Sequence, residues 1–235
     1  YDLQDCITTQ DGMPSRFVST VAKIGTDRLY AGTNDGAAVI NTNNGTVIDV
    51  WTAGDDTQRA RTVKVGDILY IGFENTGIAR YNLVTQTWLQ AWDGSQGYIS
   101  DDDVTVLIHG RNAGTIWAGG DFGLTLIDVV NDTVLKNWSR GTNADGPSIP
   151  NTSPEDIVII GDVLHYSLQR SNSWWASNDQ IYRIYIDNNT SATTLDAGSR
   201  IGSSGVVMGI GAVGNELWIG ARPTQQNQGD GTIVR

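Results

Sequence analysis

Carboxylates follow three apolar, glycine-ended segments of the chain, where they could act as an acid and a base. Asp35, Glu74 and Asp121 each come directly after such a segment, and Asp101–Asp103 precede a further apolar run. Two carboxyl groups at a suitable separation can break a glycosidic bond, one as general acid and the other as base or nucleophile. Asp beside Gly is also ordinary β-turn chemistry. The pattern favours turns and leaves, as the alternative, a glycoside hydrolase or lyase whose carboxylates converge on a common axis.

The sequence contains few of the residues that other kinds of catalytic or cofactor site require. His109 and His165 lie far apart in predicted strands, which favours interior histidines over a metal site or a nucleophilic triad. Gly209–Gly214 match G-x-G-x-x-G but lead into a predicted strand, so the helix N-terminus that cradles a phosphate is missing. Cys6 is the only cysteine, which excludes an internal disulfide. We expect no catalytic residue, no metal and no cofactor.

The elements that position these residues follow a repeat. An apolar, aromatic, apolar, glycine segment recurs at intervals of 40 to 53 residues, the last copy but one being degenerate. The copies are Leu29–Gly32, Leu69–Gly72, Ile116–Gly119, Leu164–Ser167 and Leu217–Gly220. Spacings near 40 to 50 residues are typical of propeller blades.

Each copy has the same neighbours, so that each unit is predicted to be a four-stranded meander. Preceding strands are expected at Phe17–Ile24, Thr62–Val65, Val104–His109, Asp156–Ile160 and Val206–Val213. A third strand closes on Asn or Asp, and a fourth ends in Trp at Val47–Trp51, Thr87–Trp92 and Val134–Trp138. The first two strands are apolar at nearly every position, which indicates that neighbouring sheets cover both faces.

We therefore predict an all-β fold, a single β-propeller domain over residues 1–235 with five four-stranded blades. The blades are expected near residues 16–52, 61–93, 103–139, 155–198, and 205–235 joined by 1–10. In this scheme residues 3–10 supply the outer strand of the last blade and close the ring. A slice of a larger propeller is the alternative.

Several segments resemble the two-component regulator propeller repeat, whose pattern is roughly D-G-L-P-S, an apolar strand, then L-W-I-G-T. The segments that carry the resemblance are Asp11–Ser15, Val18–Val21, Leu29–Thr33 and Glu216–Gly220. The resemblance covers essentially the whole chain, with departures at His165 and Ser167. It implies an extracellular sensor domain that binds glycans or other ligands, or a module of a large secreted protein.

Loop length predicts the binding face. The turns between first and second strands are short, whereas the long segments map to the opposite ends of the strands: residues 93–103, 139–155, 169–180 and 221–231. Exposed Trp with Arg suits stacking on a sugar or gripping a partner loop, although the Trp pair could equally anchor its own loop. The predicted ligand-binding residues are Trp174, Trp175, Arg170, Arg222 and Tyr98.

Net charge and composition indicate which classes of binding partner the chain could have. A net charge of -11 repels phosphate backbones and anionic lipid, and no apolar run is long enough to span a bilayer. Six N-x-Ser/Thr sequons favour a secreted or cell-surface chain, and a start at Tyr1 without a leader reads as an excised piece. We expect a monomeric, extracellular domain of a larger chain, with a glycan or protein ligand.

Overall fold

The structure is a computed structural model, and most of the repeat lies within the residues that it describes. These residues are 6–33, 35–51, 61–73, 75–100, 102–121, 123–139, 147, 154–168, 180–191, 194–196, 205–223 and 232–235. Within these ranges every regular element is a β-strand apart from two 3₁₀ turns, Thr9–Asp11 and Gly94–Gln96. The prediction of an all-β fold is confirmed.

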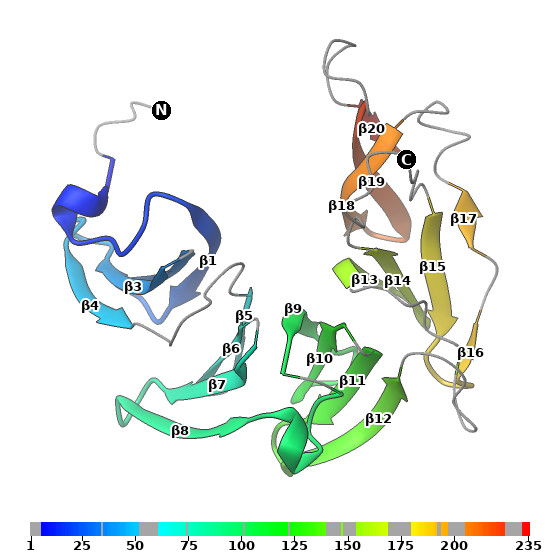
Figure 1. The fold of residues 1–235 in the computed structure, drawn as a ribbon, viewed down its shortest axis with the longest axis horizontal. Helices are drawn as coiled ribbons and strands as arrows, with labels where there is room; N and C mark the ends of the chain where they lie inside the picture. Colours follow the sequence, from blue (N-terminus) through cyan, green and yellow to red (C-terminus); the bar gives the residue numbers. More distant parts are fainter. Residues whose placement is uncertain are drawn as a thin grey trace. The chain divides into compact units, whose positions relative to one another are not determined.

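Three sheets are four-stranded antiparallel meanders in chain order (Figure 1). The first contains β1 (Val18–Ile24), β2 (Arg28–Thr33), β3 (Gly36–Asn41) and β4 (Val47–Trp51). The second contains β5 (Arg61–Val65), β6 (Ile68–Phe73), β7 (Gly77–Asn82) and β8 (Thr87–Trp92). The third contains β9 (Val104–His109), β10 (Thr115–Gly120), β11 (Gly123–Asp128) and β12 (Thr133–Ser139). The meander predicted from the repeat is therefore confirmed.

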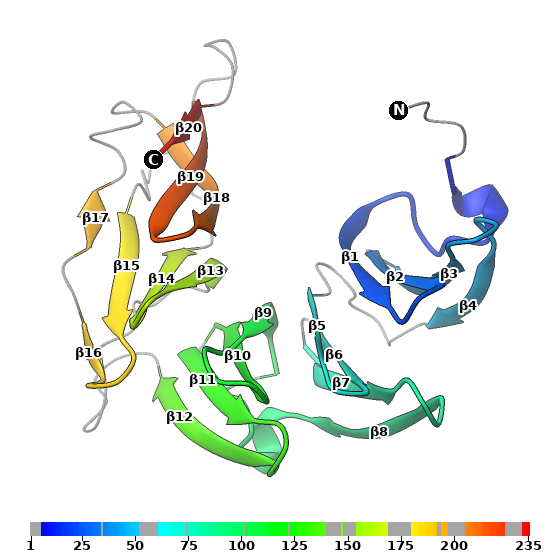
Figure 2. The ribbon, with the colours of Figure 1, turned by 180° about the vertical axis from the view of Figure 1, so that it is seen from behind.

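The last two sheets depart from this regularity. The fourth contains β13 (Pro154–Ile160), β14 (Val163–Leu168) and β15 (Gln180–Tyr185), and its outer edge is two short strands, β16 (Thr190–Ser191) and β17 (Leu195–Asp196). Both short strands pair with β15, as Figure 2 shows from behind. The fifth sheet has three strands in the described residues, β18 (Gly205–Val213), β19 (Glu216–Pro223) and β20 (Thr232–Val234).

The N-terminal strand expected at residues 3–10 is wrong for the part that the structure describes. Residues 1–5 lie outside the described residues, and Thr8 begins a 3₁₀ turn instead of a strand. The Thr8 backbone N–H donates to Asp11 Oδ2 at 2.8 Å, and Thr8 Oγ1 accepts from the Gln10 N–H at 3.2 Å. This capping box, followed by Gly12 at φ 99°, stabilises a turn locally. Closure of the ring at five blades stays a prediction.

The chain divides into two compact units, each with its own core. The first comprises Tyr1–Ala118 and Leu126–Leu135, and the second comprises Gly119–Thr125 and Lys136–Arg235. In the second unit, Ile181, Val207 and Ile219 form a buried cluster. The Asp156 carboxylate of β13 supports it by accepting the Ile210 N–H of β18 at 3.0 Å, beside a register shift in that strand.

In the first three sheets the inner strands are deeply buried. Tyr30, Leu69 and Trp117 are each 0% exposed, which confirms that these strands are covered on both faces. The first strands are less uniform than expected. β5 lies beside both β1 and β9, whereas Val21 of β1 is 60% exposed.

Gly77 begins β7 at a place where the backbone requires glycine. Its φ is +79°, and a Cβ there would overlap the carbonyl oxygen of Trp92 on β8. Gly123, which begins β11, faces the Trp138 carbonyl in the same way. The glycines that open β7 and β11 therefore let the chain turn against the ends of β8 and β12.

Gly77→Ala should lower the free energy of unfolding by about 3 kcal/mol, because it combines left-handed strain with a backbone clash. Gly97→Ala is the matched control: its φ is +77°, yet nothing lies within 4 Å of the added methyl. We expect about 1 kcal/mol for the control in urea denaturation followed by tryptophan fluorescence. Equal losses in the two variants would show that the clash contributes nothing.

Candidate functional site

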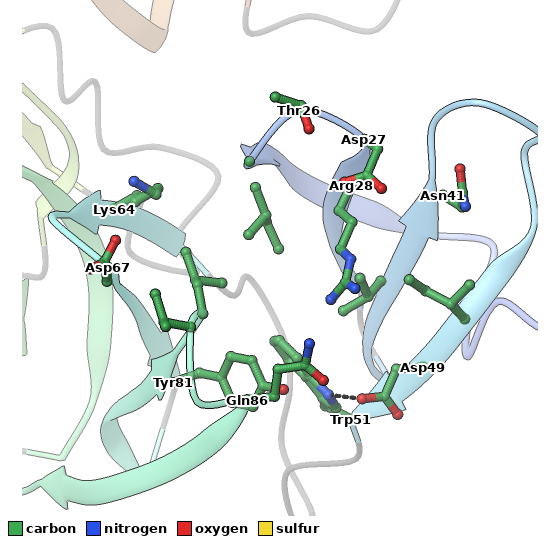
Figure 3. Close-up of a pocket in the computed structure, with 16 residues that line it drawn as sticks. Thr26, Asp27, Arg28, Asn41, Asp49, Trp51, Lys64, Asp67, Tyr81 and Gln86 are labelled. Atoms are coloured by element: carbon green, nitrogen blue, oxygen red, sulfur yellow. Dashed lines mark hydrogen bonds between the residues drawn. The ribbon is translucent and has the colours of Figure 1, made fainter.

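A cavity of about 740 Å³ lies between the first and second sheets, within the first unit (Figure 3). It opens at the ends of the strands that carry the short turns, opposite to the long segments that the sequence favoured. We call it the Trp51 cavity. Its lining residues are Ile24, Gly25, Thr26, Asp27, Arg28, Val39, Asn41, Ile48, Asp49, Trp51, Lys64, Asp67, Tyr81, Leu83, Val84 and Gln86.

Aromatic rings form one wall of the Trp51 cavity. Trp51, the last residue of β4, lies 4.5 Å from the Tyr81 ring of β7 between centroids, and Trp88 lies 4.9 Å and 5.0 Å from these two rings. Behind them the buried Tyr30 ring lies 5.6 Å from Trp51. The Trp51 indole N–H donates to Asp49 Oδ2 at 2.7 Å, which fixes the plane of the ring. Trp88 remains 47% exposed, so this wall continues onto the surface.

Polar groups surround the aromatic wall. Arg28, at the start of β2, points toward Trp51 and Gln86, while Lys64 and Asp67 lie on the opposite side of the cavity (Figure 3). Burial raises the pKa of the Tyr81 phenol, with the Asp49 charge raising it further and the Arg28 charge opposing both. The phenol is therefore a neutral hydrogen-bonding group at physiological pH.

The next pair of sheets shows why the Trp51 cavity is open. Trp92 ends β8 as Trp51 ends β4, and its ring lies 5.5 Å from Tyr70, matching the Tyr30 and Trp51 pair. Here Arg80 covers the indole, with its guanidinium carbon 4.3 Å from the ring centroid. Arg80 Nη1 also pairs with Asp132 Oδ1 at 3.2 Å. This cation and its carboxylate leave Trp92 only 2% exposed.

At the junction of the first and second sheets, small or uncharged residues take the positions of Arg80 and Asp132, the two residues that cover Trp92 at the next junction. Val39 pairs with Tyr30 as Arg80 pairs with Tyr70, so Val39 stands at the Arg80 position. Gln86 stands at the Asp132 position, because each lies four residues after the Asn82 or Asp128 side chain that closes its turn, at φ 57° and 51°. Val39 therefore leaves the space that Arg80 fills elsewhere, and Gln86 has no carboxylate with which to pair a cation there.

Solved structures share this architecture. The extracellular domain of BT3049 from B. thetaiotaomicron, described as a hybrid two component system, aligns with a TM-score of 0.67 at 16% identity over 93% of this chain. That of BT4673 from the same organism, described as a one component system, gives 0.61 at 14% over 87%. The chain covers 28% and 25% of those two proteins, about a quarter of each. The fold is a β-propeller.

More distant matches agree with this fold. The computationally designed Ika8 protein aligns with a TM-score of 0.50 at 10% identity, covering 90% of this chain and 72% of the designed one. No protein-family model and no curated protein sequence matches the chain. These comparisons support the propeller fold, whereas the blade boundaries and the relation of the repeat to two-component regulator propellers stay predictions.

The binding residues predicted from the sequence are not brought together in the described part of the propeller. Trp174, Trp175 and Arg170 lie outside the described residues, and of Arg222 only the backbone, in β19, is described. Tyr98 is half-buried and stacks on Trp92 at 4.8 Å and 18°, as part of the packing beside the second blade. A ligand site on the long-loop face stays a prediction.

The predicted chemical groups have varied surroundings. Asp35 is exposed in the turn between β2 and β3, Asp121 is half-buried in the corresponding turn of the third blade, and Glu74 lies outside the described residues. Asp102 Oδ1 accepts the Gly94 N–H at 2.6 Å, which is the turn role that was favoured. The described residues contain no group of three side chains that could hold a metal.

The two histidines differ from one another. His165 is 8% exposed, and burial, followed by the nearby Arg183 charge, lowers its pKa. His109 is exposed at the end of β9, so the prediction of an interior histidine was wrong there. Sequence reasoning also missed Arg28, Trp51 and Tyr81. A blade-by-blade comparison at the Arg80 position would have pointed to them, because Val39 breaks the pattern.

Proposed function

We propose that this chain is a non-catalytic, ligand-binding propeller domain outside the cell, and that it recognises a saccharide in the Trp51 cavity. The observation that carries the proposal is the aromatic wall of Trp51 and Tyr81, against which Trp88 packs, beside polar groups in a cavity of about 740 Å³. Cavities of about 300–1,000 Å³ hold small ligands.

The cavity chemistry suits a sugar ring. The C–H face of a pyranose is apolar and packs on an indole or phenol ring, as do other apolar groups. Its hydroxyls both donate and accept, and the amides of Asn41 and Gln86 with the carboxylate of Asp27 supply the complementary groups. The aromatic rings would bind one face of the sugar, while the polar side chains form hydrogen bonds with the hydroxyls at its edge.

The role of Asp49 supports binding in preference to catalysis. Its two oxygens accept from the Val50 N–H at 2.9 Å and from the Trp51 indole at 2.7 Å. The carboxylate therefore orients the aromatic wall, which is a positioning role.

An extracellular location is supported by two observations. The structural neighbours from B. thetaiotaomicron are extracellular domains. The sequence carries six N-x-Ser/Thr sequons. In the described part of the chain, no helix is long and apolar enough to cross a bilayer. We propose a domain of a larger secreted or cell-surface protein.

Trp51→Ala should weaken saccharide binding about 10- to 100-fold, because the stacking surface is lost. A glycan array would identify the ligand, and titration calorimetry would measure the change, with circular dichroism confirming the fold. Trp174→Ala/Trp175→Ala is the comparison variant for the long-loop face. Loss of binding in that variant alone would move the site to the long-loop face, and binding of proteins but no glycan by the parent chain would refute saccharide recognition.

A further inference from the structure

Resting on the saccharide binding proposed above, we infer that the ligand of the Trp51 cavity carries a ring carboxylate, which Arg28 binds. The ligand class is an acidic saccharide built from uronic acid units. Arg28 is then the residue that selects acidic over neutral sugars.

No described residue pairs with the guanidinium of Arg28. Arg28 pairs through its backbone with Asn41, is half-buried, and points toward the aromatic wall (Figure 3). No hydrogen bond or ion pair of its guanidinium occurs within the described part of the chain, whereas Arg80 has both Asp132 and the Trp92 ring. A partly desolvated guanidinium gains most from a carboxylate, which it can bind through two parallel N–H donors.

The fold itself does not need a cation at this position. Ile68 takes the place of Arg28 in the second blade, since Ile68 pairs with Asn82 as Arg28 pairs with Asn41. The second blade keeps the same strand register with an apolar residue there. Arg28 is therefore free to serve recognition.

Four other charged residues line the cavity. Asp27 is half-buried in the turn directly before Arg28, and the other three are hydrogen-bonded or exposed. Asp49 accepts two hydrogen bonds from its own strand. Lys64 is exposed, and its Nζ donates to the Gly66 carbonyl at 2.6 Å, while Asp67 is exposed on the adjacent turn. The net charge of -11 repels anions at long range, but salt at about 0.15 M screens exposed charges beyond about 8 Å. A direct contact with Arg28 is little affected by that screening.

The test uses two matched probes, an oligogalacturonate and the same oligosaccharide as its methyl ester, which keeps the shape and removes the charge. Titration calorimetry with the whole domain should show about 10- to 100-fold tighter binding of the acid. Arg28→Gln should abolish that preference while changing the affinity for the ester less than about threefold. Arg28→Lys should restore part of it. Lys23→Gln, which removes an exposed cation of β1 outside the cavity lining, is the control and should leave the preference intact. Glucuronate and mannuronate oligomers with their esters are measured in parallel, so that the result does not depend on one sugar.

The outcomes separate this inference from the proposed function. Selectivity that survives Arg28→Gln, or equal binding of acid and ester by the parent chain, overturns the role of Arg28. If those sugars still lose affinity in Trp51→Ala, the saccharide site itself stands. Binding of no glycan to the parent chain overturns both.

Discussion

Trp92→Ala is expected to lower the free energy of unfolding by about 3–5 kcal/mol, the range for a large aromatic removed from a core. Trp92 is 2% exposed, and three groups pack on it: the Tyr70 ring at 5.5 Å, the Tyr98 ring at 4.8 Å and the Arg80 guanidinium at 4.3 Å. Alanine would leave a void between the second and third blades and a half-buried guanidinium without its ring. Urea denaturation followed by circular dichroism measures the loss.

Trp88→Ala is the control for that experiment. Trp88 has a similar number of aromatic neighbours, Trp51 and Tyr81, but is 47% exposed on the outer strand β8. Its removal should cost less than about 1 kcal/mol, since little buried area is lost. Equal destabilisation by the two variants would mean that burial against Arg80 does not distinguish them.

The triple variant Arg28→Ile/Val39→Arg/Gln86→Asp is expected to abolish ligand binding, with at least a 100-fold loss of affinity. It would cover Trp51 with an Arg–Asp pair, as Arg80 and Asp132 cover Trp92. The three residues introduced are those found in the second and third blades as Ile68, Arg80 and Asp132. Arg28 must be changed with Val39, since the two side chains line the same cavity and two guanidinium groups would repel each other.

The free energy of unfolding of the triple variant shows whether binding is lost because the cavity is filled or because the protein no longer folds. The triple variant should unfold within about 1 kcal/mol of the parent, because the arrangement around Trp92 shows that this set of side chains is compatible with the fold. Arg28→Ile alone should remove only the preference for acidic ligands. Ligand binding that survives in a folded triple variant would show that the Trp51 cavity is not the site.

The repeat made the fold predictable from the sequence, whereas the described site depends on exceptions to that repeat. Glycine at Gly77 and aromatics at Tyr30 and Tyr70 are forced by backbone geometry and burial, so they recur and can be recognised. The Thr8 to Asp11 turn was missed because a local capping box competes with the strand expected there.

The Trp51 cavity was missed for a different reason. Loop length was used to choose the binding face, but this cavity arises from which side chains fill the space between two sheets. Val39 is an unremarkable strand residue when read by itself, and it becomes informative only beside Arg80. Tyr98 was placed among the ligand residues from composition, although packing on Trp92 holds it half-buried.

The covering of Trp92 by Arg80 has a consequence for how such a protein diversifies. The two junctions described here, between the first and second sheets and between the second and third, differ in whether a pocket is open, and the side chains at the Arg80 and Asp132 positions account for the difference. A new binding specificity can therefore arise when the side chains that cover the tryptophan at such a junction are replaced, without an insertion or a change of the backbone. Substitutions at the positions equivalent to Arg80 and Asp132 would then decide whether such a junction binds a ligand.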